Sequence, residues 1–141
     1  MRYAYLLFAL LFLPLLSLAQ NQPVDKKKHK VVIQLTSNDT LVHKALIKQI
    51  RNVQAAAPNT KIEVVCHNNG ITFLQTAVSK QCPAIAECKQ SGVDFVACEN
   101  TMRERKIKRA ELVGECRTVP AGLVEIIDKQ EKGWAYVKAG F

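Results

Sequence analysis

The sequence predicts an α/β domain of three layers, with helices covering both faces of a five-stranded, mainly parallel sheet. Short apolar runs with the length of buried strands alternate along the chain with segments whose apolar residues recur at helical spacing. Each connection between consecutive strands contains about ten residues or more, which is the length that a crossover between parallel strands requires. Because parallel sheets are buried on both faces, this alternation predicts the α/β/α layering.

Five apolar runs are expected to form the strands, and the periodic segments between them are expected to form helices. The strand runs are 31–35, 61–66, 95–97, 116–119 and 134–137. The helices are expected over 41–57, where Pro58 stops the first, over 71–78, over 84–91, from Thr101 onwards, and after Pro120, where Gly133 caps the last.

The first 19 residues are predicted to be a signal peptide and not part of the domain. Arg2 supplies the positive charge, residues 5–18 are almost wholly apolar, and Ala19 is a small residue at a typical cleavage position. The apolar run is short for a membrane span, and no second segment of spanning length follows it. We therefore expect a periplasmic or secreted protein that has no transmembrane segment after cleavage.

The mature chain is expected to hold a basic flexible lead over 20–29 and a single domain over 30–141. The sequence has 20 lysines and arginines against 12 acidic residues, which gives a net charge of +8 at pH 7. Export and the absence of strands with interleaved aromatic and basic residues argue against a nucleic-acid partner. Anionic surfaces, acidic proteins and small anions fit this charge better. No phosphate loop or dinucleotide fingerprint is present, so no cofactor is expected.

Cys98 is the main candidate for a reactive group, because it lies where a buried strand gives way to a helix. Thr101 and Glu104 have the spacing of a capping box, which predicts that the helix begins at Thr101. The free N–H groups of its first turn, with Asn100 and Thr101 as supporting residues, would lie near the sulfur and stabilise a thiolate. The alternative interpretation is a small buried cysteine that ends the strand.

Basic residues follow Cys98 closely, and Arg103, Arg105 and Lys106 are predicted to form an anion-binding rim beside it. Such a rim would attract an anionic donor or partner. The alternative is that the run is a solvated helix face, which is the ordinary role of a run of charges.

The carboxyl end of the second strand carries Cys66 and His67, which parallel strands would bring to the same sheet edge as Cys98. Cys66 is interpreted first as a core residue, with a supporting role in the site as the alternative. His67 would tune or deprotonate Cys98 if the two loops meet. A zinc or copper site formed by these three residues is a third alternative, but adjacent Cys and His are an unusual ligand spacing and no fourth ligand is evident. We therefore predict no metal.

The chain has five cysteines, so at least one stays unpaired or pairs between chains. Cys82 and Cys88 are six residues apart, and Pro83 lies between them. If the proline breaks the helix, the two cysteines could form a disulfide that closes a small loop, and this pairing is our hypothesis.

Three segments resemble the DsrE/DsrF-like family. They are Cys98-Glu-Asn-Thr after the Gly-Val-Asp-Phe strand, Glu63-Val-Val-Cys-His67 with Gly70, and the ending from Val119 to Lys138. The resemblance covers residues 30–138 and keeps the order of the elements. It implies a compact α/β domain with a five-stranded parallel sheet, assembled as trimers or hexamers. It also implies that the cysteine at the position of Cys98 carries sulfur as a persulfide and hands it to a partner protein.

Two functional hypotheses follow. The first is an exported DsrE/DsrF-like protein, similar to a sulfurtransferase, that uses Cys98 to carry sulfur or to exchange thiols with a partner protein. The second is a non-catalytic, oligomeric binding or assembly module whose cysteines are structural.

Overall fold

The computed structural model describes residues 24–140, which form one five-stranded sheet in the order β4-β3-β2-β1-β5. Every neighbouring pair of strands is parallel, so the predicted fold class is confirmed. The strands are β1 (Lys30–Leu35), β2 (Lys61–Cys66), β3 (Asp94–Cys98), β4 (Arg117–Val119) and β5 (Ala135–Lys138). The predicted signal peptide lies outside the described residues.

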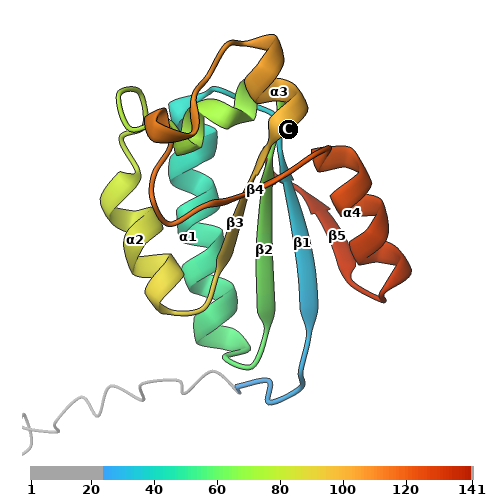
Figure 1. The fold of residues 1–141 in the computed structure, drawn as a ribbon. Helices are drawn as coiled ribbons and strands as arrows, with labels where there is room; N and C mark the ends of the chain where they lie inside the picture. Colours follow the sequence, from blue (N-terminus) through green and yellow to red (C-terminus); the bar gives the residue numbers. More distant parts are fainter. Residues whose placement is uncertain (1–23, 141) are drawn as a thin grey trace, which may run out of the picture.

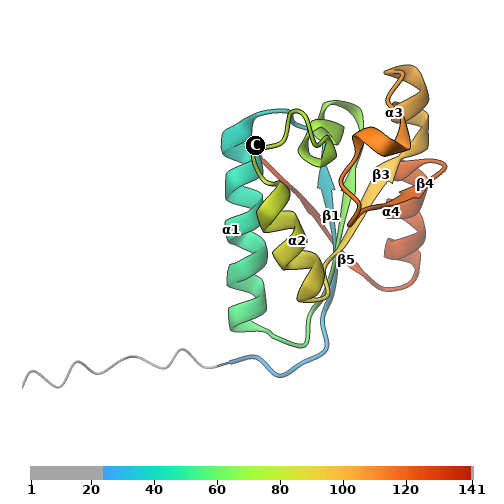
Figure 2. The same ribbon diagram turned by 60° about the vertical axis from the view of Figure 1, so that its left-hand side comes forward.

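Helices cover both faces of the sheet, as the sequence predicts (Figures 1 and 2). The α-helices are α1 (Thr40–Ala56), α2 (Cys82–Gln90), α3 (Glu99–Glu104) and α4 (Gly122–Glu131), and two 3-10 helices, η1 (Asn68–Leu74) and η2 (Arg109–Glu111), complete the connections. Helices α1 and α2 lie on one face, and α4 lies on the other (Figure 1). Within residues 24–140, no helix is both long enough and apolar enough to cross a membrane.

The two faces of the sheet bury cores of different size. The face towards α1, α2 and η1 holds the larger core, which includes Phe73, Phe95 and Leu46. The face towards α4 holds a small cluster built from one valine on each of four strands together with Ile126 of α4 and the edge of Trp134. A single helix therefore covers the second face, and its packing is sparse enough for polar groups to lie between it and the sheet.

A partly buried ion network around Glu63 joins α4 to three strands on this second face. Arg117 of β4 contacts Glu63 at 3.1 Å, Asp94 at 2.7 Å and Glu125 at 2.8 Å, and Lys129 of α4 also binds Glu63. Glu63 is only 1% exposed, and burial raises the pKa of its carboxyl group although the two cations oppose that shift. Because a buried charge is costly without its partners, this network couples the position of α4 to the sheet.

The segment after β2 differs from the sequence prediction. An α-helix was expected over 71–78, whereas a 3-10 helix runs over Asn68–Leu74 and an irregular segment follows. Gly70 packs directly on the end of β1, since a Cβ at this position would lie 2.1 Å from the carbonyl oxygen of Leu35. That close contact fixes the chain into a tight turn in which Asn68 has a positive φ of 52°.

The structure contradicts the predicted disulfide between Cys82 and Cys88. Pro83 does not break a helix but stands in the first turn of α2, which begins at Cys82 and continues through Cys88. Six residues of α-helix rise about 9 Å, whereas the Cα atoms of a disulfide are about 4.4–6.8 Å apart. All five cysteines, which lie within the described residues, have free thiols.

Candidate functional site

Cys98 ends β3 and is the N-cap of α3, so the helix begins at Glu99 and not at the predicted Thr101. The sulfur lies on the α4 face of the sheet and accepts a hydrogen bond of 3.2 Å from the backbone N–H of Gly122. Gly122 is the first residue of α4. Cys98 therefore lies between the first turns of two helices, where backbone N–H groups favour a negative charge.

The pKa of the Cys98 thiol results from opposing effects. Burial raises the pKa, but the hydrogen bond from the Gly122 N–H, together with the nearby polar groups of Thr101 and the N–H of Asn100, outweighs it, so the pKa lies below the ordinary value. Burial instead raises the pKa of Cys66, Cys88 and Cys116. The hydrogen-bonding N–H groups thus single out Cys98 for thiolate chemistry.

Thr101 lies beside Cys98 but is not the N-cap that its spacing to Glu104 predicts. Its side chain does not cap the helix but is buried, and its hydroxyl oxygen accepts a 3.0 Å hydrogen bond from the N–H of Asn68. It therefore joins the loop after β2 to α3 beside Cys98. Asn100, the other predicted supporting residue, contributes its backbone N–H to the sulfur's environment.

Cys98 lines a hollow of about 300 Å³ at the carboxyl edge of the sheet. The loop after β2 contributes His67 and Asn68, α3 contributes Asn100 and Thr101, and α4 contributes Gly122 and Leu123. Only 5% of Cys98 is exposed, so a group that reaches the sulfur must enter through this hollow, and a flat surface cannot touch it. The position agrees with the rule that ligands bind beyond the carboxyl ends of parallel strands.

His67 lies in the same hollow as Cys98, as the sequence analysis expects. The Cβ atoms of His67 and Cys98 lie 3.4 Å and 3.1 Å from the point where Gly122 would carry a side chain. Burial lowers the pKa of His67, which favours the neutral ring. Its Nε2 atom is 2.7 Å from the side-chain nitrogen of Gln34.

Cys66 does not share this environment. Successive strand residues point to opposite faces, so Cys66 projects into the large core while His67 and Cys98 lie towards α4. Cys66 is fully buried, and both this burial and its neighbour Cys116 raise its pKa. The interpretation of Cys66 as a core residue therefore fits, and its supporting role and the three-residue metal site do not. Within residues 24–140, no three His, Cys, Asp or Glu residues are grouped closely enough to hold a metal ion.

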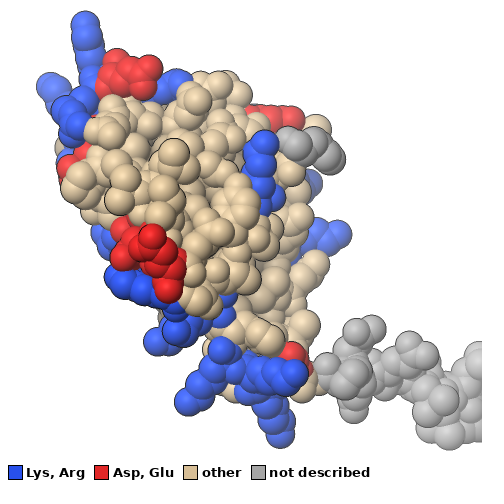
Figure 3. Space-filling view, turned by 90° about the vertical axis from the view of Figure 1, so that its right-hand side faces the viewer, with Lys and Arg blue, Asp and Glu red and all other residues tan. Residues whose placement is uncertain are grey.

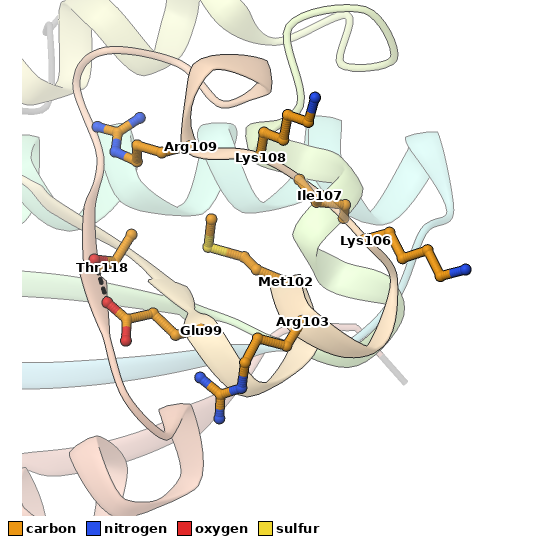
Figure 4. A pocket seen from close by; sticks show the side chains of 8 residues that line it. All are labelled: Glu99, Met102, Arg103, Lys106, Ile107, Lys108, Arg109 and Thr118. Carbon is orange, nitrogen blue, oxygen red and sulfur yellow. Dashed lines mark hydrogen bonds between the residues drawn. The ribbon is translucent and has the colours of Figure 1, made fainter.

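The predicted rim cations do not line the Cys98 hollow. Arg103 and Lys106 border a separate hollow of about 460 Å³ on the other side of α3, which Figure 4 shows around Met102. Lys108 and Arg109 complete its basic border (Figure 4). Thr118 and Glu99 form the polar side of this hollow, and the Thr118 hydroxyl donates a 2.7 Å hydrogen bond to the Glu99 carboxylate. An anion in this hollow would not touch Cys98.

Arg105 points to the loop after β2 instead. Its guanidinium donates to the side-chain oxygen of Asn68 at 3.0 Å and to that of Asn69. Arg105 therefore holds the loop that carries His67. The lowered pKa of Cys98 is caused mainly by the nearby N–H groups and not by this run of cations.

Two residues of the site, Gly122 and Gln34, were not predicted from the sequence. Gly122 follows Pro120 at the start of a predicted helix, so its free N–H could have been anticipated, but its contact with a sulfur 24 residues away could not. Gln34 is a polar residue inside an otherwise apolar strand, and such a residue is a signal that its side chain serves a buried polar partner.

Comparison with known proteins agrees with this architecture. The model of the DsrE/DsrF-like family matches residues 30–139. Among solved structures, the chain is similar to MTH1491, a protein of unknown function from Methanobacterium thermoautotrophicum, with 30% identity and a TM-score of 0.75 over 78% of this chain and 98% of that chain. BT1422, a conserved protein of unknown function from Bacteroides thetaiotaomicron, has the same fold with 16% identity and a TM-score of 0.60 over 77% and 93% of the two chains. A comparison with curated proteins found no match. The chain belongs to the DsrE/DsrF-like family.

Proposed function

We propose that this protein carries sulfur as a persulfide on Cys98 and delivers it to the thiol of a partner protein. One observation carries the proposal: the Cys98 sulfur accepts a hydrogen bond from the N–H at the start of α4 and lies beside the N–H groups of the first turn of α3, and together these groups lower its pKa below the ordinary value. A thiolate is the nucleophilic form of cysteine, so this environment favours attack on sulfur. Membership of the DsrE/DsrF-like family, which suggests sulfur relay, supports the same chemistry.

The proposed transfer needs no oxidant or reductant beyond the donor itself. The Cys98 thiolate attacks the outer sulfur of a donor persulfide, so a new S–S bond forms on Cys98 and the donor's S–S bond breaks. The donor leaves as a thiolate, which takes up the proton that the Cys98 thiol lost. In the second step a partner thiolate attacks the outer sulfur on Cys98. Cys98 then leaves as a thiolate, which is a good leaving group because the same N–H groups stabilise it.

The test is uptake of sulfur by the mature protein. The protein is incubated with glutathione persulfide near neutral pH, and peptide mass spectrometry locates any added sulfur. We expect one sulfur atom on Cys98, none on the Cys98→Ser variant, and unchanged uptake by Cys82→Ser, which removes a thiol remote from the site. Equal labelling of several cysteines, or none on Cys98, would contradict the proposal.

We further propose that the protein is exported to the periplasm or secreted, which the signal-like residues 1–19 support. Expression of the full chain in a bacterial host, followed by cell fractionation and N-terminal sequencing, tests this. The expected result is a protein outside the cytoplasm that begins at Gln20.

We also propose that the chain forms a homo-oligomer, a trimer or hexamer, through the outer face of α4. Leu123, Val124 and Ile127 of this helix are 58%, 61% and 48% exposed. The side of the molecule that carries α4 has a broad area without charged residues (Figure 3). Exposed apolar patches of this kind are typical of protein–protein contacts. Sedimentation of the mature protein tests the assembly, and Ile127→Lys should shift it towards monomer.

The alternative function, a non-catalytic assembly module with structural cysteines, is favoured by the same apolar patch. The two hypotheses differ in the reactivity of Cys98. An intact oligomer whose Cys98 is alkylated no faster than the other thiols, and takes up no sulfur, would favour the assembly module.

A further inference from the structure

A chain of hydrogen bonds runs from β5 through β1 to His67 at the end of β2. The hydroxyl of Tyr136 on β5 donates to the side-chain oxygen of Gln34 on β1. The Gln34 amide nitrogen lies 2.7 Å from His67 Nε2, at the end of β2. Three elements that are far apart in sequence thus form one polar line on the α4 face, which ends in the hollow that Cys98 lines.

The direction of these hydrogen bonds decides where the imidazole proton lies. The side-chain oxygen of Gln34 accepts a hydrogen bond from the Tyr136 hydroxyl, so the amide presents its NH₂ group to His67. An NH₂ group can only donate. With the amide in this orientation Nε2 accepts, which requires a neutral ring with the proton on Nδ1. Within residues 24–140, the contact at Nε2 is the only hydrogen bond of the ring, so the Nδ1 N–H remains available to a group bound in the hollow that His67 lines.

The charged and titratable neighbours of His67 do not favour a protonated, positively charged ring. Cys98 and Glu104 are the titratable side chains that line the hollow together with His67, and Tyr136 reaches the ring only through Gln34. Lys138 pairs with Gln34 in the strand register. No carboxylate lies within 4 Å of the His67 ring in the described part of the chain, and half-burial disfavours the imidazolium further.

We propose that Gln34 and Tyr136 are positioning residues that hold His67 neutral with its proton on Nδ1, so that His67 serves the Cys98 hollow as a hydrogen-bond donor and not as a base. The consequence for sulfur transfer rests on the function proposed above, whereas the position of the proton does not. Together with the N–H of Gly122, this donor would stabilise negative charge on a sulfur bound in the hollow. His67 with Nε2 occupied cannot take the thiol proton there.

The proton position can be measured directly in the intact mature protein by ¹⁵N–¹H NMR of the histidine rings near neutral pH. The chain has three histidines, and a His67→Asn variant identifies the signal of interest. The expected signal is an unprotonated Nε2 and a protonated Nδ1. In Tyr136→Phe, Gln34 is free to rotate and a mixture of both tautomers should appear. A proton on Nε2, or a charged ring, in the wild-type protein would overturn the proposal.

A matched pair of variants tests the consequence for Cys98. In Gln34→Glu the carboxylate can only accept, so it draws a proton to Nε2 and favours the imidazolium. A cation close to the sulfur lowers a thiol pKa by about one unit or more. At pH values below the pKa of Cys98, its alkylation should therefore become about tenfold faster than in the wild type, and its pH profile should gain a second inflection. Gln49→Glu makes the same charge change on the exposed side of α1 and should leave the profile unchanged.

The outcomes separate this inference from the proposed function. Identical pH profiles for Gln34→Glu and Gln49→Glu would refute the positioning role, even if the wild type takes up sulfur. A wild type that shows the Nδ1–H form but accepts no sulfur would refute the proposed function and leave the positioning role intact. If Gln34→Glu fails to fold, the NMR measurement on the wild type decides alone.

Discussion

Gly122→Ala should raise the pKa of Cys98, because the glycine lets the start of α4 approach the sulfur. A Cβ at this position would lie 3.1 Å from both the Cys98 Cβ and Val65 Cγ1, and 3.4 Å from the His67 Cβ. These neighbours belong to the rigid ends of β2 and β3, so the new methyl group must push α4 outward by a few tenths of an ångström. The 3.2 Å hydrogen bond from the Gly122 N–H to the sulfur lengthens as a result.

The size of the effect follows from the energy of that hydrogen bond. A hydrogen bond to a charged group contributes about 1.5–3 kcal/mol, and one pKa unit corresponds to about 1.4 kcal/mol. Complete loss of the bond would raise the pKa of Cys98 by about 1–2 units, and a partial loss by about one unit. At pH values below the pKa of Cys98, the thiolate fraction and the alkylation rate should then fall about tenfold.

The assay is the rate of alkylation by iodoacetamide as a function of pH, followed on Cys98 by mass spectrometry. Gly114→Ala is the matched control, since a Cβ there meets no atom within 4 Å, and it should leave the profile unchanged. Circular dichroism checks that both variants are folded. A folded Gly122→Ala protein with the wild-type profile would refute the claim that α4 activates the sulfur.

Three further variants test the surroundings of the site, each measured by urea denaturation. Lys129→Met should destabilise the fold by about 3 kcal/mol at neutral pH, because the buried Glu63 loses one of its two cations. This attraction exists only above the pKa of Glu63, so the loss should shrink as the pH falls and Glu63 takes up a proton; Lys132→Met, which removes an exposed ion pair, should change little at any pH. Gly70→Ala should cost about 2–3 kcal/mol, because its methyl group would collide with the last carbonyl of β1. Thr101→Val should cost about 1–3 kcal/mol, since it leaves a loop N–H unpaired, and should also raise the pKa of Cys98.

The order of strands and helices was predictable because each element follows a clear hydrophobic period. Local patterns predict β1 and β2 from the apolar runs at 31–35 and 61–66, and α1 from the helical spacing over 41–57. The 3-10 helix after β2 was not predictable in this way. Its shape depends on the contact of Gly70 with Leu35, which the chain makes only once β1 and β2 are paired.

The candidate site was predictable only where one segment forms it. The position of Cys98 at a strand end before a helix is a local feature, and so is the supply of N–H groups from α3. The contributions of Gly122 and Gln34 join elements that are distant in sequence, and no local pattern identifies the partner in such a contact. The alternation of side chains along a strand did contain a usable signal, since adjacent Cys66 and His67 must face opposite sides.

The only tryptophan of the chain, Trp134, follows α4 and lies beneath the ammonium group of Lys129, 4.6 Å from the ring centroid. Indole fluorescence depends on nearby charge and on contact with water, so its emission should report whether α4 is seated on the sheet. The same helix brings the Gly122 N–H to Cys98. Loosening of α4 should therefore change the emission spectrum and slow Cys98 alkylation together, which makes an intrinsic fluorophore a continuous optical readout of the sulfur's environment.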